Sequence, residues 1–125
     1  MKKIGFIDYC IDNWHAKTFP GLIRGSMYGD DFEVALAWEE TSPGEAMPIE
    51  AWCRDQGVDQ AESIQQLVEE CDCIAVLSPN APERHEKLAD LALQSGKPVY
   101  IDKTFAPTRA AAERMFAKAE RYSTP

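Results

Sequence analysis

The sequence predicts an α/β fold of three layers, in which helices cover both faces of a doubly wound parallel sheet of about five strands. Short apolar runs of strand length alternate with amphipathic segments of helix length along the whole chain. The runs lack polar–apolar alternation, which is typical of parallel strands buried on both faces. The 125 residues, 45% of them hydrophobic, suffice for one domain with its own core, which we place at residues 1–125.

The strands are expected where the apolar runs lie. There are four clear runs and one weaker edge candidate. They occupy residues 4–7, 32–38, 73–77 and 99–101, with the edge strand within 58–61. Strand, helix and strand in succession imply right-handed crossovers and parallel pairing.

Five helices are expected between and after these strands, at residues 13–25, 48–57, 63–71, 82–95 and 108–122. Pro48 and Gly57 bound the second, and Ser63 begins a capping box with Gln66 for the third. Pro20 predicts a kink or a restart in the first. The apolar spacing of the last two helices turns these side chains inward: Leu88, Leu91, Ala92, Ala112, Met115, Phe116 and Ala119.

The charge balance narrows the partners. Thirteen basic and twenty-one acidic residues give a net charge of −8, which disfavours nucleic acid and anionic membrane surfaces. No apolar run approaches the roughly 20 residues of a membrane helix, and the first run is too short for a signal peptide. The four cysteines, Cys10, Cys53, Cys71 and Cys73, have no framework spacing. We therefore expect reduced thiols and a cytoplasmic protein.

Three segments are expected to meet at one edge of the sheet. In an open parallel sheet, ligands bind outside the carboxyl ends of the strands, where the strand order reverses. Residues 8–15, 78–82 and 102–107 follow three of the strands. The sequence thus predicts that Asp8, Asn80 and Lys103 are neighbours at a binding crevice.

Each polar residue at this edge has a functional and a plain interpretation. Lys103 could donate to a substrate hydroxyl or carbonyl, or lie in solvent. Asn80 and the amides around it could bind a ribose or an amide, or Asn80 could cap the next helix. Glu39 could accept hydrogen bonds from the ribose hydroxyls, in which case its negative charge would disfavour a 2′-phosphate, or it could belong to an ordinary acidic loop. His85 is by default a surface histidine, and His15 could face the crevice or cap a helix.

The loop after the first strand contains no glycine, whereas dinucleotide-binding loops usually have the pattern G-x-G-x-x-G. Asp8 and Asp12 would repel phosphates there, although the following helix still offers backbone amides. Asp8, Asp12 and His15 could alternatively hold a cation. Cys71-x-Cys73 lacks metal-site spacing, and we expect no metal.

Taken in order, these segments resemble the amino-terminal domain of the Gfo/Idh/MocA oxidoreductase family. Residues 73–80, CIAVLSPN, look like the family's strand ending in Thr-Pro-Asn. Residues 96–104, GKPVYIDKT, look like its Gly-Lys-x-Val-x-x-Glu-Lys-Pro segment, and His85 stands at the usual distance before it.

The resemblance implies a Rossmann fold, a nicotinamide cofactor and hydride transfer at a hydroxyl-bearing carbon of a sugar or cyclitol. Lys103 corresponds to the motif lysine and is the expected catalytic residue, with His85 beside it as a substrate contact. NAD rather than NADP is expected from the acidic pair Glu39 and Glu40. The cofactor-binding residues are expected to be Asp8, Tyr9, Asp12, Glu39, Ser78, Pro79, Asn80, Asp102 and Lys103.

The chain ends where the family's sixth strand would begin, so we expect a sheet truncated before that strand and a domain incompetent for turnover alone. Two alternatives stay open. A degenerate domain without cofactor could act as an interaction module, pairing with itself through an exposed sheet edge. A phospho-acceptor receiver domain is disfavoured, because Ser78 and Pro79 follow the third long strand where the acceptor aspartate should stand.

Overall fold

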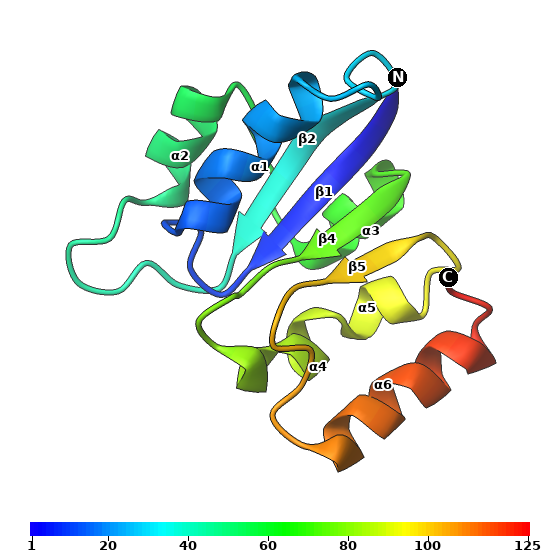
Figure 1. The fold of residues 1–125 in the computed structure, drawn as a ribbon. Helices are drawn as coiled ribbons and strands as arrows, with labels where there is room; N and C mark the ends of the chain where they lie inside the picture. Colours follow the sequence, from blue (N-terminus) through cyan, green and yellow to red (C-terminus); the bar gives the residue numbers. More distant parts are fainter.

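The computed structural model describes all 125 residues and contains one five-stranded parallel sheet in the order β3-β2-β1-β4-β5 (Figure 1). The strands are β1 (Lys2–Asp8), β2 (Phe32–Glu39), β3 (Asp59–Gln60), β4 (Cys73–Val76) and β5 (Val99–Ile101). The helices are α1 (Trp14–Arg24), α2 (Ile49–Gln56), α3 (Ile64–Glu70), α4 (His85–Leu88), α5 (Asp90–Leu93) and α6 (Arg109–Arg121), with the 3-10 turn η1 (Pro82–Arg84) before α4. The α/β Rossmann-like class is thereby confirmed.

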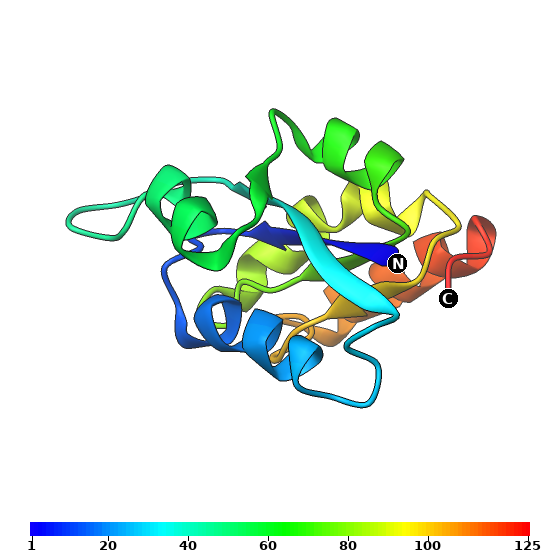
Figure 2. The ribbon, with the colours of Figure 1, turned by 90° about the horizontal axis from the view of Figure 1, so that it is seen from above.

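Two apolar clusters hold the helices on opposite faces of the sheet, as Figure 2 shows from above. Neighbouring residues of β1 point to opposite faces. Phe6 packs with Trp52 in the cluster beneath α1 and α2. Ile7 packs with Leu67 and Met115 in the cluster beneath α3, α5 and α6.

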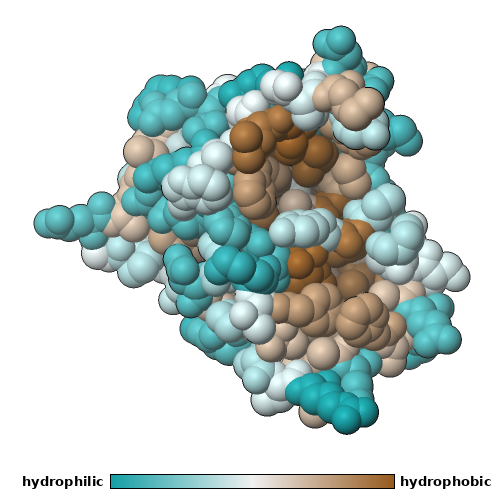
Figure 3. Space-filling model, viewed as in Figure 1, coloured by the Kyte–Doolittle hydropathy of each residue, from teal (hydrophilic) through white to brown (hydrophobic).

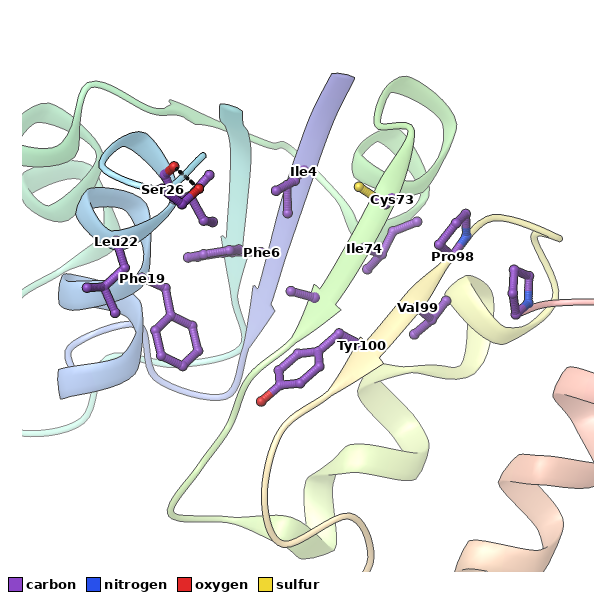
Figure 4. A pocket seen from close by; sticks show the side chains of 13 residues that line it. Ile4, Phe6, Phe19, Leu22, Ser26, Cys73, Ile74, Pro98, Val99 and Tyr100 are labelled. Carbon is purple, nitrogen blue, oxygen red and sulfur yellow. Dashed lines mark hydrogen bonds between the residues drawn. The ribbon is translucent and has the colours of Figure 1, made fainter. Parts of the chain in front are cut away.

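The two faces are not equally covered, which differs from the expected sheet with helices over both. On the side of α1, no helix lies over β4 and β5, and an apolar groove of about 600 Å³ runs there. Figure 3 shows it as a brown hollow. In Figure 4, Phe19 and Leu22 of α1 form one wall, and Val99 and Tyr100 of β5 form the other.

Two helix expectations are wrong in detail. Helix α1 continues through Pro20, which is buried, so the chain does not restart there. The helix expected at 82–95 is divided into η1, α4 and α5, and Ala89, with φ −87° and ψ −5°, lies between α4 and α5. The buried face of this segment includes Ala89, Ala92 and Leu93, whereas Leu91 is 41% exposed.

In α6, Met115 is buried as expected but Phe116 is 64% exposed and stacks on Phe105, with ring centroids 4.9 Å apart. No helix of the fold combines the length and apolarity needed to cross a membrane. All four cysteines are free.

Helix α3 packs directly on β1 because the strand has a glycine at the contact. A Cβ atom on Gly5 would lie 2.4 Å from the Leu67 Cδ2 atom, closer than two carbons can approach. The ladder between β1 and β2 shifts register beside this glycine, between Ile4 and Gly5. The helix itself begins as predicted, since the Ser63 hydroxyl accepts the Gln66 N–H at 3.0 Å.

Candidate functional site

The carboxyl ends of β1, β4 and β5 meet at one edge of the molecule. The Asp8 carboxylate accepts the Ser78 N–H at 3.1 Å, which joins the ends of β1 and β4. The His15 imidazole pairs with the Asp102 carboxylate, which joins the start of α1 to the end of β5. Residues of the loops after β1 and β4 enclose a hollow of about 180 Å³. They are Asp8, Tyr9, Cys10, Asp12, Asn13, Ser78, Pro79, Asn80 and Ala81.

Asp8 is a buried carboxyl group at the start of the β1–α1 loop, only 1% exposed. It accepts hydrogen bonds from Asn13 Nδ2 at 2.7 Å and from the Cys10 N–H at 3.3 Å, besides the Ser78 N–H. Burial raises the pKa of Asp8 to about 7, although these donors oppose the shift. The group is therefore partly protonated near neutral pH.

Glu39 and Asp12 fasten the same loop to the chain around it. The two Glu39 carboxylate oxygens accept the N–H groups of Ile11 and Ile49, each at 3.0 Å, and burial raises the Glu39 pKa. Asp12 accepts the Met47 N–H at 2.8 Å and pairs with Lys17, whose ammonium group lowers the Asp12 pKa. These oxygens are thus already engaged within the protein.

The alternative cation site does not form. Asp8 faces Asn13 and Ser78, Asp12 faces Lys17, and His15 faces Asp102. The three candidate ligands therefore turn toward separate partners. Nowhere do three or more histidine, cysteine or acidic side chains gather in a way that could hold a metal ion.

At the end of β4, the segment from Ser78 to Asn80 contributes an unusual backbone and a free amide. Ser78 has φ 44°, a left-handed conformation that residues other than glycine seldom adopt. Its hydroxyl donates to the Ala81 carbonyl at 3.0 Å. Asn80 is exposed and does not cap the following turn, whose N-cap is Ala81, so the capping interpretation is wrong. Its side-chain amide is available to a ligand.

His85 lies inside the protein rather than on its surface, with no exposure at all. Its Nε2 atom is 2.7 Å from the Leu77 carbonyl oxygen, and its Nδ1 atom is 3.0 Å from that of Phe105. This burial leaves no ring atom free to reach a ligand in the crevice, contrary to the expected substrate contact. His85 instead ties the end of β4 to the segment after β5.

At the end of β5, Asp102 is 2% exposed and organises the chain around it. It accepts the Lys103 N–H at 2.8 Å and the Tyr100 hydroxyl at 3.0 Å, in addition to its pairing with His15. Burial, and then the bond to Asp102, raise the pKa of Tyr100. Lys103 itself is exposed at this edge.

Sequence reasoning missed several residues of the site. Asn13 caps α1 by accepting the Ala16 N–H at 2.9 Å, and an asparagine just before an apolar helix is a detectable signal. Arg84 lies 4.8 Å from the centroid of the Tyr9 ring and bonds Glu40 at 3.0 Å. No short-range pattern links Arg84 to Glu40, because 44 residues separate them.

The β1–α1 loop does not fit a pyrophosphate as it stands. A Rossmann domain holds this group with backbone N–H groups at a glycine-rich turn. Here the amides of Cys10, Ile11 and Ala16 donate to protein side chains. The two first amides of α1, at Trp14 and His15, have no such acceptor. The fit is better at the ends of β4 and β5, where free polar side chains remain.

Comparison with known proteins agrees with the family resemblance of the sequence. Residues 26–124 match the model of a family described as an oxidoreductase family with an NAD-binding Rossmann fold. No curated protein matches the chain.

Solved structures share the fold. The dehydrogenase MviM from Clostridium difficile is 25% identical with a TM-score of 0.74, and the match covers 98% of this chain and 37% of that one. UDP-N-acetylglucosamine 3-dehydrogenase from Acidithiobacillus ferrooxidans is 16% identical with a TM-score of 0.75, and the match covers 98% of this chain and 35% of that one. Biliverdin reductase from Synechocystis, solved with biliverdin and NADP+, is 19% identical with a TM-score of 0.73, and the match covers 98% of this chain and 35% of that one. The chain thus spans about a third of the length of these proteins.

Proposed function

Because the chain belongs to the Gfo/Idh/MocA oxidoreductase family, we propose that it is the nucleotide-binding domain of a nicotinamide-dependent dehydrogenase. The reaction it serves is oxidation or reduction at a hydroxyl-bearing carbon of a sugar or cyclitol-like molecule, as the family resemblance implies. The observation that carries the assignment beyond the family is the placement of Asn80 and Lys103, both exposed, after adjacent strands at the carboxyl edge.

The nicotinamide half of the ligand is assigned to the ends of β4 and β5. Asn80 offers an amide that can donate to or accept from a ribose hydroxyl or a carboxamide. The Lys103 ammonium group can donate to a substrate hydroxyl or carbonyl and stabilise negative charge that develops there. Asp102 is a positioning residue, because it accepts the Lys103 N–H and is itself paired with His15.

The choice between NAD and NADP stays open in this proposal. Glu39 was expected to select NAD by accepting ribose hydroxyls, but both of its oxygens accept backbone N–H groups. Arg84 lies near the end of β2 through its bond to Glu40, and an arginine in this region can accommodate a 2′-phosphate. Both cofactors therefore belong in the test.

The test is calorimetric titration of the chain with NAD+, NADH, NADP+ and ADP-ribose. We expect Lys103→Ala to weaken the binding of the nicotinamide dinucleotides by about tenfold and to leave the affinity for ADP-ribose unchanged. In this proposal Lys103 contacts only the nicotinamide half of the cofactor. Lys87→Ala, which removes another exposed lysine, is the matched control. Absence of heat with every dinucleotide at millimolar concentration would refute the proposed function.

A second candidate function is self-association. The loop that would hold a pyrophosphate is closed on itself, and β5 is an outer strand beside an apolar groove. A second copy of the chain could pair with this edge and cover the groove. Light scattering decides: a concentration-dependent dimer without dinucleotide binding would favour this function, and a monomer at high concentration would rule it out.

A further inference from the structure

Asp8 stands at the point where the phosphates of a dinucleotide would approach the β1–α1 loop. We propose that the Asp8 carboxyl group controls dinucleotide binding: the pyrophosphate approaches the loop only when Asp8 is protonated, so affinity is higher in mildly acidic than in mildly alkaline solution. This inference rests on the proposed function and names the regulation of the same site.

The geometry makes Asp8 the obstacle. It is the last residue of β1, its side chain is 1% exposed, and it lines the hollow formed by the loops after β1 and β4. Little water can therefore screen its charge from a second anion in the hollow. It also takes up the amides of Cys10 and Ser78, which could otherwise face that anion. A pyrophosphate would thus meet negative charge where a Rossmann loop offers N–H groups.

The elements that adjoin Asp8 carry several titratable and charged groups. They are Cys10 and Asp12 of the loop, His15 and Lys17 of α1, Glu39 and Glu40 at the end of β2, Arg84 of η1, His85 of α4 and Asp102 after β5. Most are already paired: Asp12 with Lys17, Glu40 with Arg84, and His15 with Asp102.

Asp8 itself has no cation as a partner, since its hydrogen bonds come from Asn13 and from backbone amides. Burial raises its pKa to about 7, so it changes charge in the neutral range. The pKa of the Cys10 thiol is raised, mainly by burial, and the thiol is neutral there. Glu39 also has a raised pKa and is the group that the experiment must separate from Asp8.

Protonation removes the charge of Asp8 without displacing it. A neutral carboxyl keeps an acceptor oxygen for the surrounding donors and no longer repels a phosphate. The free amides at the start of α1 then provide the remaining attraction for the pyrophosphate. Between about pH 6 and about pH 8, a group with a pKa of about 7 loses roughly nine-tenths of its protonated form, so affinity should fall about tenfold.

The experiment is calorimetric titration with ADP-ribose and NAD+ at these two pH values, with adenosine as an uncharged ligand. The wild-type chain should bind ADP-ribose and NAD+, which both carry a pyrophosphate, about tenfold more weakly at the higher pH, and should bind adenosine equally at both. Asp8→Asn, which mimics the protonated group, should bind equally at both values and about tenfold more tightly than wild type at the higher one. Asp8→Gly should behave in the same way.

Two control variants isolate the effect. Asp72→Asn removes a carboxylate at the opposite end of β1, where it accepts the Lys3 N–H at 2.7 Å, and should keep the wild-type pH dependence. Glu39→Gln should keep it as well. Circular dichroism verifies that each variant is folded, and Asp8→Asn preserves the test if Asp8→Gly does not fold.

The outcomes separate the two proposals. Binding that is independent of pH in the wild type, or pH dependence that persists in Asp8→Asn or disappears in Glu39→Gln, would overturn the role of Asp8 and leave the proposed function standing. Absence of binding by the wild-type chain at both pH values would refute the proposed function, and this inference with it, even if Asp8→Asn or Asp8→Gly binds. Failure of every variant at both pH values would refute the proposed function and, with it, this inference.

Discussion

The two halves of the crevice are built in opposite ways. On the side of β1 and β2, the carboxylates of Asp8, Asp12 and Glu39 turn inward onto backbone amides and close the loop on itself. On the side of β4 and β5, buried His85 and Asp102 hold the backbone, while Asn80 and Lys103 project free polar groups. In the first half the polar side chains stabilise the loop after β1, whereas in the second half the polar side chains are exposed and can contact a ligand.

The two halves differ in what accepts the hydrogen bonds of the loop after β1. Glycine allows the backbone to approach a phosphate, so the bound ligand completes the hydrogen bonds of the loop. In this chain, side-chain carboxylates and Asn13 complete them from within. The carboxylates that accept these amides also carry negative charge, which opposes the phosphates of a ligand.

The largest effect expected from this comparison is a pH-dependent stability that Asp8 confers. Its pKa rises from 3.8 in the unfolded chain to about 7 in the fold, so the folded state binds this proton more tightly. Stability relative to Asp8→Asn should therefore be greatest at about pH 4 and below, fall by about 4 kcal/mol between about pH 4 and about pH 7, and change little above that. Urea denaturation of both proteins across this range measures it. A stability difference that does not change with pH would contradict the buried, uncompensated carboxyl.

The next largest effect belongs to the other half. His85→Ala should reduce the free energy of unfolding by about 3 kcal/mol, because the carbonyls of Leu77 and Phe105 lose their partner in a fully buried place. Urea denaturation at neutral pH gives the value. His85→Gln, which retains a donor, should recover part of the loss. A cost below about 0.5 kcal/mol for His85→Ala would mean that the two segments do not depend on this link.

The smallest effect is expected at the junction of the halves. His15→Ala should cost about 1 kcal/mol, because Asp102 keeps the Tyr100 hydroxyl and the Lys103 N–H as partners. His15→Asn should restore most of it, since its amide can donate close to the position of Nδ1. Thermal denaturation compares the two variants. Equal losses in both would show that ring packing against Phe19, and not the bond to Asp102, is what His15 contributes.

Much of the architecture could be predicted because the signals for it are local. The four apolar runs predicted four strands, the edge strand Asp59–Gln60 lies within the weaker candidate at 58–61, and Ser63 marked the start of α3. The convergence of three segments at one edge followed from strand polarity alone. The position of the crevice was therefore predictable without any contact being known.

What could not be predicted depends on contacts between distant residues. Leu91 has the spacing of a buried residue, yet the helix buries Ala89 and Leu93 instead and leaves Leu91 41% exposed. Glu39 has the position of a ribose ligand, yet Ile11 and Ile49 occupy its oxygens. Burial of His85 depends on the segment at Phe105, which is 20 residues away. For Glu39 and His85, the burial and hydrogen bonds of the side chain thus depend on partners that are distant in the sequence.

The glycine of β1 has a consequence for anyone who redesigns this chain. Because no side chain fits between Gly5 and Leu67, this residue sets the thickness of the molecule at its centre. An added methyl would require the side chains of Leu67 and Cys71, which α3 and its C-cap hold against β1, to shift. The same strand ends three positions later at Asp8, so residue 5 is the place where repacking of α3 can be tested for an effect on the binding edge.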